Sequence, residues 1–132
     1  MTTGLLIISH ENIGAALADT ASLMLEMCPM ALELLPVLPG CTPESLYDRA
    51  LAAVRRLDRG GGVLVLTDMY GSTPSNVANR LARESNVMVV AGLNLPMLVR
   101  VFNYPGLSLP ELAHKAVSGG RDGIFICEQN VK

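Results

Sequence analysis

The chain has 132 residues, of which 50% are hydrophobic and 17% are charged. This balance supplies enough apolar material for one compact domain over residues 1–132 and excludes a disordered chain. The net charge is −2 and no basic run exceeds Arg55-Arg56, which argues against nucleic acid and anionic membranes as partners. Three widely spaced cysteines and an N-terminus without a signal-peptide pattern predict a cytoplasmic protein that meets a membrane only through another protein.

The chain opens with two predicted strands separated by a helix. Residues 5–8 are a continuous apolar run, which is typical of a strand covered on both faces. Residues 13–28 repeat apolar side chains at helical spacing and predict a helix. Its predicted inward face consists of Ile13, Leu17, Met24 and Cys28, with Ala16, Thr20 and Ala21 alongside. A weaker strand at 32–38 is placed at a sheet edge, because Pro36 has no N–H to donate to a neighbouring strand.

The middle of the chain repeats this alternation. Thr42-Pro43-Glu44 supplies an N-cap, a first-turn proline and an acid near the positive end of the dipole, and so predicts a helix. The glycines at 60–62 end it. Its predicted inward side chains are Leu46, Ala50, Val54 and Leu57. Residues 63–66 predict a second buried strand, and Thr73-Pro74 repeats the cap-and-proline signal. The helix after that cap is predicted to bury Val77, Ala78 and Leu81.

The last part of the chain predicts two more strands around one helix. Residues 87–90 form a third buried strand, which we expect to be central in the sheet together with the runs at 5–8 and 63–66. Ser108 and Glu111 form a capping box for a helix that Gly119-Gly120 is predicted to end. Its predicted inward side chains are Leu112, Ala116 and Val117. Residues 124–127 predict a fifth strand, so that the whole pattern predicts an α/β fold with a mostly parallel sheet.

Polar side chains follow three of these strands where each strand ends. Residues 9–12 follow the first strand, 67–74 follow the strand at 63–66, and 92–97 follow the strand at 87–90. In an open parallel sheet the ligand crevice lies beyond the carboxyl ends of the strands. Since adjacent strands are only ~5 Å apart, His10 and Asp68 meet if their strands are neighbours.

A histidine beside a carboxylate at this edge predicts a nucleophile. A neutral imidazole whose Nδ1–H is held by Asp68 presents Nε2 outward, and the carboxylate stabilises the positive ring that forms when His10 is phosphorylated. Gly71, Ser72 and Thr73 add backbone N–H groups, two hydroxyls and a helix N-terminus for the phosphoryl oxygens. The two loops together therefore predict a phosphoryl site.

Each signal has a simpler interpretation when it is taken alone. A histidine after a strand is more often a solvated loop residue than a catalyst, Asp68 and Asn94 suit turns, and Thr73 suits a helix cap. Their joint occurrence at one sheet edge favours a site. His114 is left out of it, because its place on the last helix lies opposite the apolar face.

The sequence predicts neither a metal nor a cofactor. Its two histidines lie far apart and lack a carboxylate cluster, so they do not form a metal site. The triple glycine precedes a strand and is not followed by the Lys-Ser or Lys-Thr pair of a nucleotide P-loop.

The chain resembles the enzyme IIA domain of the mannose class of the bacterial phosphoenolpyruvate-dependent sugar phosphotransferase system. The resemblance runs over nearly the whole length and rests on Ser9-His10 and on the segments 68–76 and 91–98. It implies that His10 takes phosphate from the phosphocarrier protein HPr and passes it to a IIB domain, for sugar uptake through a permease. Asp68 would hold His10, while Gly71, Ser72 and Thr73 would bind phosphate.

The resemblance also implies a doubly wound fold with an antiparallel C-terminal edge strand, and a homodimer. Tyr70, Asn94 and Pro96 would belong to loops of the site or of the partner surface. Because the sequence contains no fused IIB domain, a regulatory phosphocarrier without a dedicated permease is an alternative role.

Two other classes of protein share parts of this pattern. A response-regulator receiver would take phosphate on Asp68, but it needs an acidic pair where Ser9-His10 stands and a lysine where Glu128-Gln129 stands. A non-catalytic module would hold a small anion in the same crevice without covalent chemistry, and phosphorylation by HPr distinguishes it from a carrier.

Overall fold

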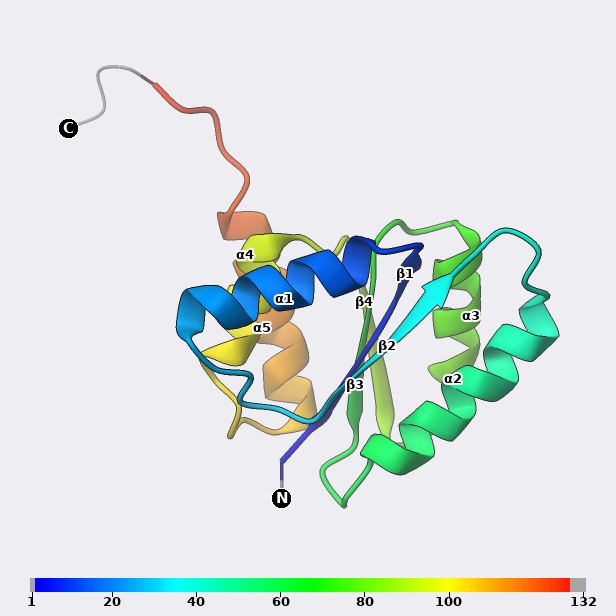
Figure 1. The fold of residues 1–132 in the computed structure, drawn as a ribbon. Helices are drawn as coiled ribbons and strands as arrows, with labels where there is room; N and C mark the ends of the chain where they lie inside the picture. The colour runs from blue at the N-terminus through cyan, green and yellow to red at the C-terminus, as the bar shows by residue number, and fades with distance from the viewer. Residues whose placement is uncertain (1, 129–132) are drawn as a thin grey trace.

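The computed structural model describes residues 2–128 and contains one sheet of four parallel strands. These are β1 (Gly4–His10), β2 (Leu32–Val37), β3 (Val63–Thr67) and β4 (Val87–Ala91). Their order in the sheet is β2-β1-β3-β4 (Figure 1). The predicted α/β fold with a parallel sheet is therefore confirmed, and β2 lies at an edge, where Pro36 was expected to place it.

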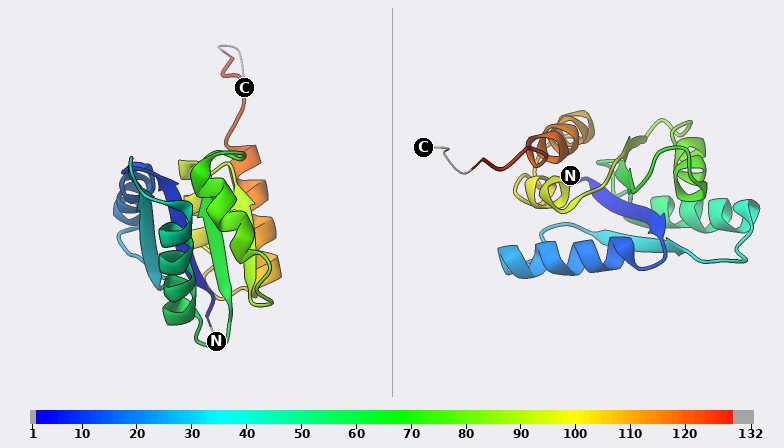
Figure 2. Two further views of the ribbon diagram at one scale, coloured as in Figure 1. Left: turned by 90° about the vertical axis from the view of Figure 1, so that its right-hand side faces the viewer. Right: turned by 90° about the horizontal axis from the view of Figure 1, so that it is seen from above.

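Helices cover both faces of the sheet, as a doubly wound fold requires. α1 (Ile13–Leu25), α4 (Leu95–Phe102) and α5 (Leu109–Asp122) pack on one face, while α2 (Pro43–Leu57) and α3 (Thr73–Leu81) pack on the other (Figures 1 and 2). Successive residues of β1 alternate between the two cores, since strand side chains point to opposite faces. All these strands end at the same edge, so their loops lie together there.

The predicted inward faces of the second and third helices are confirmed. Thr42 caps α2, with its side-chain oxygen accepting the Ser45 N–H at 3.2 Å, and Pro43 is in the first turn. The predicted inward residues are buried, namely Leu46, Ala50, Val54 and Leu57 in α2 and Val77, Ala78 and Leu81 in α3. The cap-and-proline signal therefore located both helices, although the N-cap of α3 is Ser72 rather than Thr73.

The predicted inward face of the first helix is only partly right. Leu17 packs against the core and Ala21 is buried. Ile13, Met24 and Cys28, by contrast, are exposed, and the helix ends before Cys28. The residues of α1 that are buried are Gly14, Ala18 and Ala21. Small side chains line this face because α1 packs closely on β1, where a Cβ on Gly14 would lie 2.6 Å from Ile7 Cγ2. Large apolar side chains are left on the solvent side.

Helix α4 lies where we expected only a loop. Asn94 is its N-cap, with Oδ1 accepting the Met97 N–H at 2.9 Å, and Pro96 is in the first turn. This is the same cap-and-proline signal that located α2. Because α4 covers α5 closely, Gly119 and Gly120 continue α5 instead of ending it. A Cβ on Gly119 would lie 2.5 Å from Arg100 Cβ.

The predicted strand at 124–127 does not form. Residues 124–128 leave the end of α5 and extend away from the domain, with Ile124, Phe125 and Ile126 exposed (Figure 1). Since α5 continues to Asp122, it delivers this segment beyond the sheet, where it pairs with no strand of residues 2–128. The central position predicted for β4 is therefore wrong, since β4 is an edge of the sheet. Residues 2–128 of one chain do not show the antiparallel edge strand.

Candidate functional site

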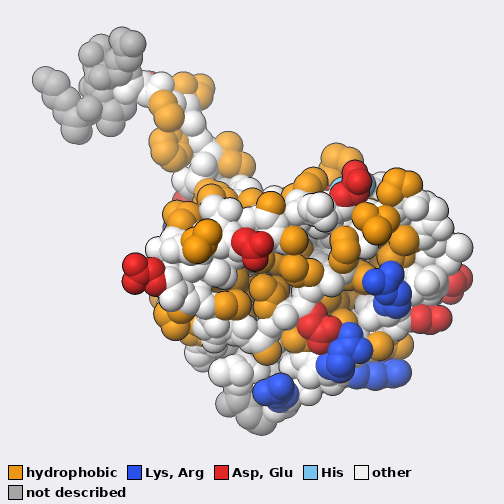
Figure 3. Space-filling model, viewed as in Figure 1, with side chains coloured by type: hydrophobic (Ala, Val, Ile, Leu, Met, Phe, Trp, Pro, Cys, Tyr) orange, Lys and Arg blue, Asp and Glu red, His pale blue; other side chains and the backbone are white. Residues whose placement is uncertain are grey.

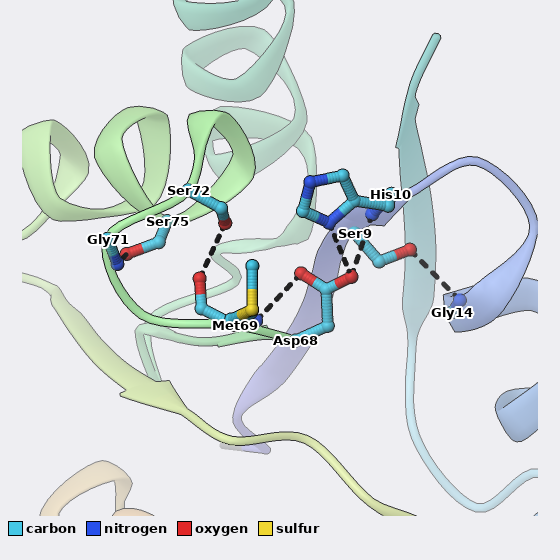
Figure 4. A network of polar contacts seen from close by, with 8 residues as sticks. All are labelled: Ser9, His10, Gly14, Asp68, Met69, Gly71, Ser72 and Ser75. Carbon is cyan, nitrogen blue, oxygen red and sulfur yellow. Dashed lines mark hydrogen bonds and ion pairs between the residues drawn. The ribbon is translucent and has the colours of Figure 1, made fainter.

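His10 and Asp68 lie together at the carboxyl end of the sheet, as their strands predicted. β1 and β3 are direct neighbours, with Ile8 opposite Thr67, so the residues that follow each strand are adjacent. One carboxylate oxygen of Asp68, Oδ2, lies 2.9 Å from His10 Nδ1 and accepts the backbone N–H of His10 at 2.9 Å (Figure 4). The histidine is therefore held at two points by one carboxylate.

The carboxylate of Asp68 is ionised in this arrangement. Partial burial by itself would raise the pKa of Asp68, but hydrogen bonds from the His10 backbone, the His10 ring and the Met69 N–H together lower it. An ionised carboxylate only accepts hydrogen bonds, so Nδ1 of His10 carries the proton. In a neutral ring Nε2 then has a free lone pair. The His10 side chain is 43% exposed and that of Asp68 is 11% exposed, which leaves the ring accessible.

The loop that carries His10 is a tight turn between β1 and α1. Glu11 has a φ of 42°, which is unusual for a residue other than glycine. Its N–H donates to Val37 O at 3.1 Å, and the buried Ser9 hydroxyl accepts the Gly14 N–H at 2.9 Å. The Gly14–Ser9 bond joins the two ends of the turn, and the Glu11 bond ties the turn to β2, so together they fix the position of His10.

The loop after Asp68 is also held by its own side chains. The Gly71 N–H donates to Ser75 Oγ at 3.1 Å, and the Ser72 hydroxyl donates to Met69 O (Figure 4). Ser72 is the N-cap of α3 but makes no side-chain cap hydrogen bond. Two of the predicted phosphate donors, Gly71 N–H and the Ser72 hydroxyl, are therefore engaged within the loop, and Thr73 remains in the first turn of α3.

A surface hollow of about 310 Å³ contains His10 and Thr73. The loop after β2 completes its wall with Leu38, Gly40 and Cys41. Our sequence reasoning missed this loop, although it follows the strand predicted at the sheet edge and so had to end beside His10. A larger hollow of about 740 Å³ lies over α5 beside the exposed His114, and neither His10 nor Asp68 lines it.

The structure separates Asn94 and Pro96 from this hollow. Asn94 Nδ2 donates to Gly120 O at 3.2 Å, and a Cβ on Gly123 would lie 2.4 Å from Pro96 Cγ. These two residues thus join α4 to the end of α5. Tyr70, by contrast, lies in the loop after Asp68 and is 76% exposed.

Residues 2–128 contain neither a group of side chains suited to a metal ion nor a membrane-spanning helix. No three His, Cys, Asp or Glu side chains in this part of the chain are grouped so that they could hold a metal ion. None of its helices combines the length and the hydropathy needed to cross a membrane.

Comparisons with known proteins agree with this geometry. Residues 4–117 match the EIIA-man family, described as the PTS system fructose IIA component. The chain is 32% identical over 127 residues to the PTS system mannose-specific EIIAB component of Escherichia coli (strain K12). That match covers 94% of this chain and 39% of the relative. The PTS system fructose-specific EIIA component of Bacillus subtilis is 25% identical over 99 residues, a match that covers 74% of this chain and 68% of that relative.

Solved structures show the same fold. The mannose/sorbose-specific IIA subunit from Enterococcus faecalis has a TM-score of 0.88 at 22% identity, with coverage of 100% of this chain and 99% of that one. A PTS IIA protein associated with the fucose utilization operon of Streptococcus pneumoniae has a TM-score of 0.77 at 28% identity, with 96% of each chain covered. The chain therefore belongs to the EIIA-man family, the mannose- and fructose-type IIA components of the sugar phosphotransferase system.

Proposed function

We propose that this protein is a phosphohistidine carrier that accepts a phosphoryl group from HPr on His10 and passes it to a IIB domain for sugar uptake. The observation that carries this proposal is the 2.9 Å contact between His10 Nδ1 and Asp68 Oδ2. It fixes the ring in the tautomer whose Nε2 is a nucleophile. The half-exposed ring then meets a partner at the surface.

The transfer step uses only groups that the site and the donor hold. Nε2 of His10 attacks the phosphorus of the donor phosphohistidine, a new N–P bond forms, and the N–P bond of the donor breaks with its electron pair returning to the donor ring. Positive charge develops on the His10 ring, and the Asp68 carboxylate stabilises it. Thr73 offers a hydroxyl and a backbone N–H, at the positive end of α3, to the phosphoryl oxygens.

The surface around His10 suits a protein as the phosphoryl donor. Four exposed apolar side chains lie in or beside the loops of the site, namely Ile13, Leu38, Met69 and Tyr70. Figure 3 shows hydrophobic side chains at the upper right, where these loops lie. The loops 9–12, 38–42 and 68–72 contain Glu11 and Asp68 but no Lys or Arg. The partner therefore brings the cation that balances the transferring phosphoryl group.

Phosphorylation of Asp68 is disfavoured by the same geometry. Oδ2 accepts two hydrogen bonds from His10 and Oδ1 accepts the Met69 N–H at 2.9 Å. An aspartate that accepts phosphate needs an accessible oxygen, whereas this side chain is 11% exposed. The more exposed His10 is the better acceptor.

The wider role that we propose follows from the family. The name of the E. coli relative joins an A and a B component, and this chain matches 39% of that protein, which supports a IIB domain as the acceptor. We place the carrier in the cytoplasm, where HPr would meet it, as a homodimer with no cofactor. The dimer is supported by the open edge of β4 and by the exposed apolar residues 124–126.

Labelling with phosphoenolpyruvate, enzyme I and HPr tests the function. The wild-type chain and His114→Ala should each gain one phosphoryl group by intact-protein mass spectrometry, whereas His10→Ala should gain none. His114 is the matched control because it is an exposed histidine that lies outside the site. Full labelling of the His10→Ala protein would overturn the assignment.

A further inference from the structure

We infer that two buried serines, Ser9 and Ser75, are positioning residues that lock the two loops of the phosphoryl site by accepting the N–H of a glycine across each loop. This inference rests on the proposed transfer at His10. Ser9 is 2% exposed and Ser75 is fully buried, and neither is a member of the reacting group (Figure 4). Each serine binds across the loop that carries one half of the site.

Ser9 does for α1 what an N-cap normally does. An N-cap side chain usually accepts the second or third N–H of its helix, but Asn12, the N-cap of α1, makes no such bond. The Gly14 N–H, the second of the helix, instead donates to Ser9 Oγ at 2.9 Å. Ser9 precedes His10 and Gly14 follows it, so this bond closes the turn that presents the ring.

Only glycine fits opposite Ser9 in this turn. A Cβ on Gly14 would lie 2.8 Å from Ser9 Oγ and 2.6 Å from Ile7 Cγ2. The close approach lets the hydroxyl reach the N–H while it remains buried. Without the hydroxyl the Gly14 N–H would be buried and unpaired. The turn that contains Glu11, with its φ of 42°, would then lose the bond that joins its two ends.

Ser75 holds the second loop in a similar way. It is the third residue of α3, and its hydroxyl reaches back past the N-cap to accept the Gly71 N–H at 3.1 Å. Gly71 has a φ of 86°, and a Cβ there would meet nothing within 4 Å, so the glycine is needed for its backbone conformation. Because Ser75 accepts the Gly71 N–H, the loop from Asp68 to Thr73 is held in one conformation, which keeps Thr73 beside His10.

The two hydrogen bonds have different consequences for the reaction. The Ser9–Gly14 bond fixes the orientation of the His10 ring, because it joins the residues on either side of His10. The Ser75–Gly71 bond fixes the position of Thr73, which would bind the phosphoryl oxygens, because it holds the loop that precedes Thr73. A misplacement of reacting groups by 1 Å costs on the order of 100-fold in rate, so we expect roughly 10- to 100-fold slower transfer when either hydroxyl is removed.

The experiment compares Ser9→Ala and Ser75→Ala with Ser108→Ala. Ser108 caps α5 through a capping box at the opposite end of the sheet, near Thr3, so its loss destabilises the fold without touching either loop. Four quantities are measured for each protein: the free energy of unfolding, the ¹⁵N chemical shifts of the His10 ring, hydrogen exchange at the Gly71 N–H, and the dependence of transfer rate on phospho-HPr concentration. The ring shifts are recorded on unphosphorylated protein, so they need no transfer partner.

We expect Ser9→Ala to move the ring shifts toward a mixture of the two neutral tautomers and to slow transfer. Ser75→Ala should leave the ring shifts unchanged, accelerate hydrogen exchange at the Gly71 N–H, and lower the maximal rate without raising the half-saturating concentration of phospho-HPr. Ser108→Ala should lose stability but keep the wild-type shifts and rate.

Other outcomes contradict the inference. Wild-type shifts in Ser9→Ala, or wild-type maximal rates in either serine variant, would remove these residues from the positioning role. Equal slowing in Ser108→Ala would show that the effect is only loss of stability. If wild-type protein accepts no phosphate at all, the proposed function fails, while the ring shifts still report whether Ser9 fixes His10.

Discussion

A single carboxylate oxygen of Asp68 accepts both the backbone N–H and the ring Nδ1–H of His10, each at 2.9 Å. The backbone bond fixes where the carboxylate lies, and the ring bond fixes which nitrogen faces outward. A side chain that bonded only the ring would move with it. This double contact therefore orients the His10 ring, as the proposed role of Nε2 as a nucleophile requires.

Replacing Asp68 by asparagine should slow phosphoryl transfer while keeping the fold. An amide of the same shape still accepts one hydrogen bond but does not stabilise the positive ring of phosphorylated His10, so we expect a loss of about 100- to 10,000-fold. Rapid-quench measurement of transfer from phospho-HPr gives the rate, and circular dichroism checks the fold. An unchanged rate in a folded variant would remove Asp68 from the site.

The contribution of Asp68 to stability should depend on pH in acid. Its pKa in the folded protein is below the ordinary value of 3.8. The charged carboxylate therefore adds stability that is fully present above the unfolded pKa and is lost as pH falls through the lower folded pKa. Urea unfolding of wild type and Asp68→Asn between about pH 7 and 2 should show a constant difference down to about pH 4 that shrinks below it. A difference that shrinks mainly above pH 5 would contradict the lowered pKa.

The contact of α5 with α4 should be sensitive to one methyl group. In Gly119→Ala the new Cβ would lie 2.5 Å from Arg100 Cβ, and we expect a loss of about 1–3 kcal/mol in the free energy of unfolding. Gly106→Ala is the matched control, because its Cβ meets nothing within 4 Å and should change stability by less than about 0.5 kcal/mol. Equal stability of the two variants would mean that α5 does not pack on α4 as described.

The chain should form a dimer through its C-terminal segment. Ile124, Phe125 and Ile126 are exposed, and the open edge of β4 offers unpaired backbone groups that a strand from a second copy would satisfy. Light scattering at micromolar concentration should give twice the mass of one chain for wild type and one chain for Ile126→Asp. A stable wild-type monomer, or a dimeric Ile126→Asp protein, would contradict this assignment.

Much of the fold was predictable because the sequence pattern of an element agrees with its burial in the structure. The central strands β1 and β3 are continuous apolar runs, and α2 has both an N-cap and a regular buried face. The face of α1 was mispredicted because close packing on β1 selects Gly14, Ala18 and Ala21, whereas hydrophobic spacing favours larger side chains. Helix α4 was missed although Asn94 and Pro96 repeat the signal of α2.

The pairing of His10 with Asp68 was predictable from the sequence, and the contacts of the surrounding loops were less so. His10 and Asp68 follow neighbouring strands, so their meeting follows from sheet topology alone. Hydrogen bonds within a loop leave no such pattern in the sequence. The Gly71 N–H therefore looked available for phosphate although Ser75 accepts it, and Asn94 looked like a site residue although it holds the end of α5.

The chemical stability of the phosphorylated protein tests the assignment of His10 most directly. A phosphohistidine is a phosphoramidate whose ring leaves when it is protonated, whereas an aspartyl phosphate is a mixed anhydride that base and hydroxylamine cleave. After labelling through HPr, the phosphoryl group should be lost in mild acid and should survive both strong base and hydroxylamine, with no metal needed for the step from phospho-HPr. Loss of the label in hydroxylamine, or a magnesium requirement for that step, would place the phosphate on Asp68 and contradict the account.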